Sequence, residues 1–242
     1  MGLFLEANIA DNFMIKGVLK MPFKFLGGEV WITDSIISMW LVSLIIVGFA
    51  IVCNLTMKKA TRENKIVPSG FQNFVEMIVD LIDNMAAGTL GSEKAKSFRN
   101  YIGTIFIFIL IANLSGLLGL RAPTADYGVT LPLGIFTFLI IQFQGFKNNG
   151  INNILDLFKP SPLLFPINLI GEVTTPITLS LRLFANLLSG VIIMGLWYSF
   201  LVPFLLHLGI PAFLHLYCDL FSGCIQAYVF SMLTMVYVSQ KF

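Results

Sequence analysis

The chain has 242 residues, of which 57% are hydrophobic and only 12% are charged. A soluble domain of this length could not bury so much apolar surface, so the composition predicts an integral membrane protein. The formal net charge of +2 and the lack of a long Lys or Arg tract argue against nucleic acid as a partner.

The first apolar run is preceded by a segment of mixed character. Residues 1–34 are assigned to an outer N-terminal segment. Residues 35–57 are long enough to cross a hydrocarbon core of ~30 Å. The residues that follow this span are typical of a cytoplasmic end: Lys58, Lys59, Arg62 and Lys65.

Residues 69–90 have the pattern of an amphipathic helix rather than of a span. Large apolar side chains recur at helical spacing on one face, while acids and amides occupy the others. Such a helix is expected to lie along the membrane surface. Lipid-surface helices favour Lys and Arg, so the acids favour docking on a protein neighbour; a connector packed on its own domain is the alternative.

The remaining apolar segments form a hairpin and two long stretches. Residues 100–147 predict a transmembrane hairpin with an outer turn, and residues 163–242 hold the long stretches. The first of these, 163–206, would be about 66 Å long as one helix. Either it makes two spans or it is one tilted helix, which we prefer because no turn signal interrupts 179–194. The distribution of Lys and Arg then places the N-terminus outside and the C-terminus in the cytoplasm.

Together these patterns predict an all-α integral membrane protein that forms a single membrane domain, 1–242. It should have about five transmembrane helices, the last two long and tilted, plus one amphipathic surface helix. No phosphate-binding glycine loop, His-Glu metal motif or nucleophile elbow occurs, so we expect no catalysis within the chain, no metal and no cofactor. The cysteines lack metal-type spacing and are expected to be reduced packing residues: Cys53, Cys218 and Cys224.

Arg182 is the residue to which the sequence most directly assigns a function. A charge at the middle of a bilayer costs about 3 kcal/mol or more, so its presence there needs a reason. One alternative is that Arg182 reaches an interface, but about 20 nearly unbroken apolar residues follow it. Another is pairing with Glu172, but ten residues of helix separate the two by about 15 Å.

Polar residues are expected to line one face of each long helix. On the first, Asn168 and Glu172 lie on the side of Arg182 and Asn186. On the second, the spacing of four and seven residues places its polar groups on one face: His215, Asp219 and Gln226. Two such faces suggest an ion pathway. The alternatives are an interfacial pair for Asp219 with His215, and a simple backbone hydrogen bond for Gln226.

Three segments resemble subunit a of F-type ATP synthases of the bacterial type. The most specific is Ser180–Asn186, read as SLRLFAN. It is supported by Gln226–Tyr237 near the C-terminus, and by Asn113–Leu118 followed by Ala122–Ala125 in the outer hairpin. The likeness extends over about residues 69–240.

This resemblance implies a fold and a role for each polar residue. It implies two long tilted helices against a ring of c subunits, with the b-subunit peripheral stalk, other synthase subunits and lipid as further partners. Arg182 resembles the arginine that faces the ring's ion-binding carboxylate, and Asn186 and Gln226 resemble its polar neighbours. Glu172 resembles an acid toward the cytoplasmic half-channel, and Asp219 is placed in the outer one.

The implied function is that of a non-catalytic stator subunit, which carries H⁺ or Na⁺ through two offset half-channels in the bacterial plasma membrane. A guanidinium is permanently charged and favours the ionised form of a nearby carboxylate, which promotes ion release and blocks a leak. Two positions depart from the family pattern. Val191 stands where some members carry an acid or a histidine, and Gly116 stands where others carry an acid. The outer pathway is therefore expected to depend on Asp219, with His215.

Two other classes of function are alternatives. A self-contained secondary transporter or ion channel should have more intramembrane acids, broken helices or a repeat, and the sequence has none of these. A purely structural assembly subunit would have no need of Arg182.

Overall fold

The computed structural model describes residues 17–25, 28–62, 70–118, 120–150, 162–200, 213–214 and 216–241. Five helices in it are long and apolar enough to cross a membrane. This confirms the predicted all-α membrane class and its number of spans. The candidate spans are Asp34–Lys59, Lys96–Leu117, Tyr127–Asn149, Phe165–Trp197 and Leu216–Ser239.

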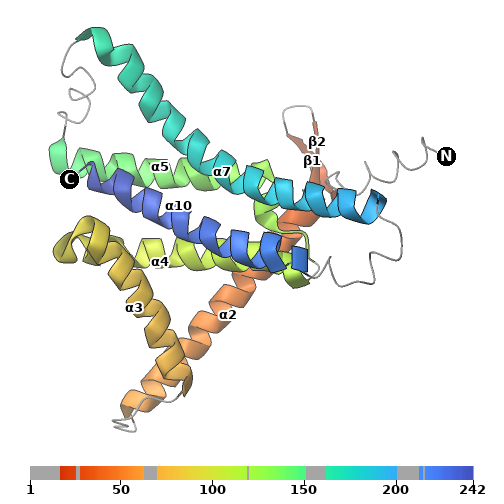
Figure 1. Cartoon of the computed structure of the whole chain (residues 1–242), viewed down its shortest axis with the longest axis horizontal. Helices are drawn as coiled ribbons and strands as arrows, with labels where there is room; N and C mark the ends of the chain where they lie inside the picture. Colours follow the sequence, from red (N-terminus) through yellow and green to blue (C-terminus); the bar gives the residue numbers. More distant parts are fainter. Residues whose placement is uncertain are drawn as a thin grey trace. The chain divides into compact units, whose positions relative to one another are not determined.

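The element order is β1 and β2, then α2, α3, α4, the short helices η1 and η2, α5, η4, α7, η5 and α10 (Figure 1). The helices have the following bounds: α2 (Asp34–Arg62), α3 (Gly70–Leu90), α4 (Ser92–Leu114), η1 (Ser115–Leu118), η2 (Pro123–Ala125), α5 (Tyr127–Asn149), η4 (Pro162–Leu164), α7 (Phe165–Phe200), η5 (Leu216–Phe221) and α10 (Ser222–Ser239).

An antiparallel hairpin precedes α2, where the sequence predicted only a segment of mixed character. It consists of β1 (Gly17–Phe25) and β2 (Gly28–Thr33), with Lys20 opposite Trp31. The second strand leads directly into α2, which begins at Asp34, one residue before the predicted start of the first span at 35.

The long stretch from 163 to 206 folds as one helix, α7, over its described part. It has 36 residues and no break, although Pro176 lies inside it. The one-helix prediction is therefore confirmed. The second long stretch begins, as described, with η5, a π-helical turn, and continues as α10. Such turns widen a helix locally and are frequent at functional sites.

The contacts divide the chain into two compact units. Unit 1 comprises Met1–Leu41, Ile109–Ile135 and Pro176–Ala227, and unit 2 comprises Val42–Phe108, Phe136–Thr175 and Tyr228–Phe242.

In unit 2, α3 packs on the neighbouring helices through one face only. Its last turns join an apolar cluster with α4, α5 and α10. The chain turns from α3 into α4 at Gly91, whose φ of 79° suits a glycine after a helix end. Beyond this corner, Arg99 donates to Asp83 over 3.0 Å. The cluster consists of Ala86, Leu90, Phe98, Ile102, Ile141, Met235 and Val238.

In unit 1, α5 and α7 touch at backbone level. A Cβ placed on Gly134 would lie 2.7 Å from the Pro176 carbonyl oxygen and 3.1 Å from Ser180 Cβ. Close approach of this kind is common where small residues mediate packing in membranes. It places the half of α7 that carries Arg182 directly against α5.

We therefore expect Gly134→Ala to destabilise the subunit. The added methyl group meets backbone, which cannot move aside as a side chain can, so a loss of about 1–3 kcal/mol is expected. The measurement is the temperature at which the subunit is lost from the detergent-solubilised complex. Gly48→Ala is the matched control, because a Cβ there meets nothing within 4 Å; equal shifts in both variants would contradict the prediction.

Candidate functional site

Arg182 lies in the middle of α7 with its side chain exposed on unit 1. Leu179 and Leu183, which neighbour Arg182 on the helix, are buried, at 1% and 0% exposure. The exposed neighbours at helical spacing are small: Thr178, Ala185 and Ser189. A charge on a spanning helix, among residues that allow a second helix to come close, favours a protein partner over lipid.

Asn186, one turn after Arg182, contacts α10. Its Oδ1 accepts a hydrogen bond of 2.8 Å from the Ser222 hydroxyl. Its Nδ2 and the Nε2 of Gln226 are both buried, with no hydrogen-bond partner among the described residues. The hydrogen bond joins α7 to α10 at Asn186 and Ser222. Ser222, which makes the contact, was not predicted, because a serine in an apolar run gives no distinct signal.

Glu172 lies near the start of α7, in unit 2, and its carboxylate is paired. Lys241 Nζ lies 2.6 Å from Glu172 Oε1, and Gln142 of α5 donates to the same oxygen. The side chains of Lys241 and Glu172 are only 18% and 27% exposed. Asn148 Nδ2 also donates a hydrogen bond of 3.4 Å to the Lys241 carbonyl oxygen. The sequence analysis did not predict this pair, since a contact across 69 residues leaves no local pattern.

We expect Lys241→Met to destabilise the packing of α10 on α7. The variant leaves a half-buried carboxylate without its cation, which costs about 1–3 kcal/mol. Thermal release of the subunit from the solubilised complex measures the effect. Lys241→Arg should behave as the parent, and Glu172→Gln with Lys241→Met should recover stability, because removing both partners leaves no unpaired charge. A double variant as unstable as Lys241→Met would contradict this explanation.

Asp219 lies in the π-helical turn η5 and is half-buried in unit 1. Its carboxyl group lies beside Gly116 of η1. Gly190 of α7 lies near the same π-helical turn, since a Cβ placed on it would lie 3.6 Å from Cys218 Cβ. His215, its predicted companion, is outside the described residues. Within the described ranges, no group of three or more His, Cys, Asp and Glu could hold a metal ion.

Asn113 and Thr124 form a buried polar contact that sequence reasoning did not assign a role. Thr124 Oγ1 donates to Asn113 Oδ1 over 2.8 Å, and Asn113 Nδ2 donates to the Gly223 carbonyl oxygen over 3.0 Å. Asn113 and Thr124 are 1% and 0% exposed. This contact ties the end of α4 and the turn after it to the start of α10, next to Asp219.

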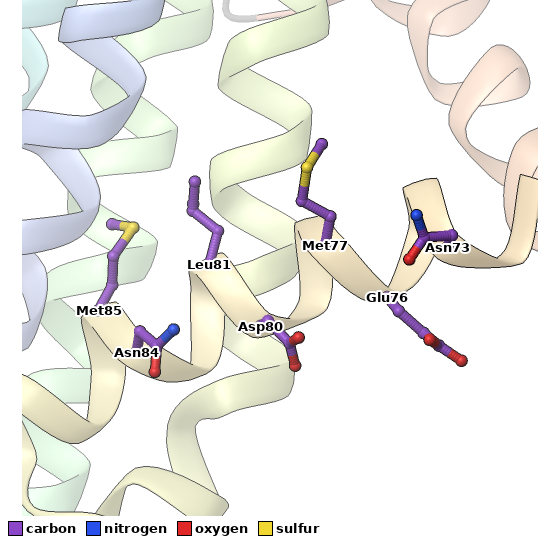
Figure 2. A pocket seen from close by; sticks show the side chains of 7 residues that line it. All are labelled: Asn73, Glu76, Met77, Asp80, Leu81, Asn84 and Met85. Carbon is purple, nitrogen blue, oxygen red and sulfur yellow. The ribbon is translucent and has the colours of Figure 1, made fainter. Parts of the chain in front are cut away.

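A shallow hollow of about 570 Å³ lies along α3, in unit 2 (Figure 2). Figure 2 shows Met77, Leu81 and Met85 extending to one side of the helix, with Glu76 and Asp80 on the other. None of the predicted ion-path residues lines it. The separation of apolar and acidic side chains is that of an interfacial helix.

Comparisons with known proteins all point to one family. A protein family described as ATP synthase A chain matches residues 36–239. The sodium-ion-specific ATP synthase subunit a of Propionigenium modestum is 38% identical over 224 residues, which is 86% of this chain and 73% of the relative. ATP synthase subunit a 2 of Chlorobaculum tepidum is 32% identical, over 98% of this chain and 72% of its own. ATP synthase subunit a of Trichlorobacter lovleyi is 35% identical, over 85% of each chain.

Proposed function

Because the chain belongs to the ATP synthase A chain family, we propose that it forms two offset half-channels that carry H⁺ or Na⁺ to and from the carboxylates of a c-subunit ring. Its membership makes it a multi-pass, ion-translocating membrane subunit of an ATP synthase, with other synthase subunits as partners. The ring, the b-subunit peripheral stalk and the half-channels are parts of the proposal.

The exposed position of Arg182 carries the proposal. Facing lipid, this guanidinium would cost about 3 kcal/mol or more on a helix that spans the membrane. Facing a ring carboxylate, the same charge is compensated. The small residues Thr178, Ala185 and Ser189 leave room for a helix of the ring beside it.

In the proposed mechanism each remaining polar residue has a place along the path. Glu172 serves the cytoplasmic half-channel, and Asp219, with His215, serves the outer one. The amide nitrogens of Asn186 on α7 and Gln226 on α10 are buried without a hydrogen-bond partner among the described residues, and these two amide groups would solvate or pass an ion near mid-membrane. Arg182 favours the ionised ring carboxylate and so releases its ion. A potential of 100 mV supplies about 2.3 kcal/mol per charge for the movement.

The proposed location is the bacterial plasma membrane, with the N-terminus outside and the C-terminus in the cytoplasm. The support is the excess of Lys and Arg in the segments assigned to the inside, such as Lys58, Lys59, Arg62 and Lys65 after the first span.

The test is purification of the complex from its membrane, followed by reconstitution into liposomes. We expect the chain to co-purify with a ring of small hairpin proteins and to move ions only when that ring is present. Ion flux through the chain alone would instead support the rival function of a self-contained channel or transporter.

The same preparation identifies the coupling ion. The relative from Propionigenium modestum is described as sodium ion specific, so Na⁺ is the first ion to test. ATP hydrolysis that rises with Na⁺ at fixed pH would identify a sodium enzyme, and hydrolysis independent of Na⁺ would identify H⁺.

A further inference from the structure

Gly116 and Asp219 lie against each other in unit 1, although 103 positions separate them along the chain. A Cβ placed on Gly116 would lie 3.7 Å from Asp219 Cγ, and 3.8 and 3.9 Å from its two carboxylate oxygens. Their elements, η1 and η5, are in contact. The carboxyl group of Asp219 therefore lies next to the side-chain position that Gly116 leaves empty.

The backbones that carry the two residues are held together independently of them. Asn113, three residues before Gly116, donates to the carbonyl oxygen of Gly223, one turn after Asp219, over 3.0 Å. A Cβ on Gly223 would lie 3.0 Å from Asn113 Cβ, which shows how closely the two backbones approach. Replacing Gly116 or Asp219 leaves this contact in place.

From this geometry we propose that positions 116 and 219 make up one carboxylate site of the outer half-channel, to which either position can supply the acid. The proposal rests on the function proposed above. Gly116 determines which position supplies the acid: because glycine has no side chain, it leaves the space to Asp219.

The distances support an exchange of the acid between the two positions. In an aspartate at 116, the carboxyl carbon would extend about 1.5 Å beyond the Cβ. The built Cβ is 3.7 Å from Asp219 Cγ, so the new carboxylate could reach the space that Asp219 now fills. With both acids present, two like charges would share one half-buried space, which is unfavourable.

The experiment moves the acid from one position to the other within the intact complex. Asp219→Gly, Gly116→Asp and the double variant Gly116→Asp with Asp219→Gly are compared by the initial rate of ATP-driven ion uptake into vesicles. Co-purification with the rest of the complex verifies assembly. The double variant Gly116→Asn with Asp219→Gly is the matched control, because it restores size and polarity without the charge.

We expect Asp219→Gly to slow ion uptake roughly tenfold or more, and the acid-bearing double variant to return to within roughly threefold of the parent. Gly116→Asp alone should be slower than the parent. The asparagine control should stay as slow as Asp219→Gly.

Three outcomes would overturn the proposal, and they differ in what else they affect. An assembled acid-bearing double variant as slow as Asp219→Gly would refute the shared site and leave Asp219 in the pathway. Equal recovery with the asparagine control would show that packing, not the acid, matters. Parental uptake in Asp219→Gly would also remove Asp219 from the proposed half-channel.

Discussion

Replacing Arg182 with Ala is expected to abolish both ATP synthesis and ATP-driven ion pumping while the complex still assembles. The side chain is exposed on α7, so its loss opens no cavity and leaves no buried group unpaired in the described part of the chain. What is lost is the fixed positive charge. In the proposed mechanism, no positive charge then favours the ionised form of the ring carboxylate, so ion release should stop. Synthesis in energised vesicles and assembly by co-purification are the two measurements.

Two further variants separate charge from geometry at Arg182. Arg182→Lys keeps the charge, but an ammonium differs in reach and hydration and lacks the planar fork of donors, so it should fail as well. Retained activity in this variant would show that charge alone suffices. Leu181→Ala alters the adjacent exposed side chain, 44% exposed, and should keep coupling. Near-normal synthesis in Arg182→Ala would refute the assignment.

The helices could be predicted from sequence because their signal is local and long. The run from 163 to 206 is apolar and shows no turn signal over 179–194, and the structure has α7 from Phe165 to Phe200. The amphipathic segment 69–90 likewise appears as α3, Gly70–Leu90. The π-helical turn at Asp219 has no such signal, because one extra residue per turn leaves the apolar composition unchanged.

The hairpin before α2 was missed although a weak signal was present. From Leu19 to Phe25 apolar residues alternate with Lys20, Pro22 and Lys24, which is the period of a strand. The run is short, and a proline inside it counts against a strand. Pairing with β2 supplies the missing stability, and such a partner is not visible within one segment.

The candidate site was predictable in its charges but not in its contacts. A charge in an apolar run is conspicuous, so Arg182, Glu172 and Asp219 were found. Their neighbours are ordinary residues brought close by folding: Ser222, Gln142, Lys241 and Gly116. Nor does periodicity say that Arg182 faces outward while Asn186 faces α10, since adjacent turns of a helix can contact different partners.

Asn113→Leu is expected to be the most damaging change away from Arg182. Leucine has the same branching as asparagine but can neither accept from Thr124 nor donate to the Gly223 carbonyl oxygen. Hydrogen bonds in membranes contribute only about 0.6 kcal/mol on average. The larger cost comes from buried groups left unsatisfied, about 1–3 kcal/mol each. The measurement is the temperature at which the subunit is lost from the solubilised complex, which should be lower in the variant.

Two single-partner variants identify which contact of Asn113 matters. Asn113→Asp keeps the acceptor for Thr124 but sets a carboxylate oxygen against the Gly223 carbonyl, so it should be as damaging as leucine. Thr124→Val removes only the hydroxyl and leaves the bond of 3.0 Å to Gly223, so its loss should be smaller. If Thr124→Val were the more damaging of the two, the turn after α4, rather than the α4–α10 contact, would hold this end of the subunit together. Parental stability in Asn113→Leu would show that the buried amide contributes nothing to it.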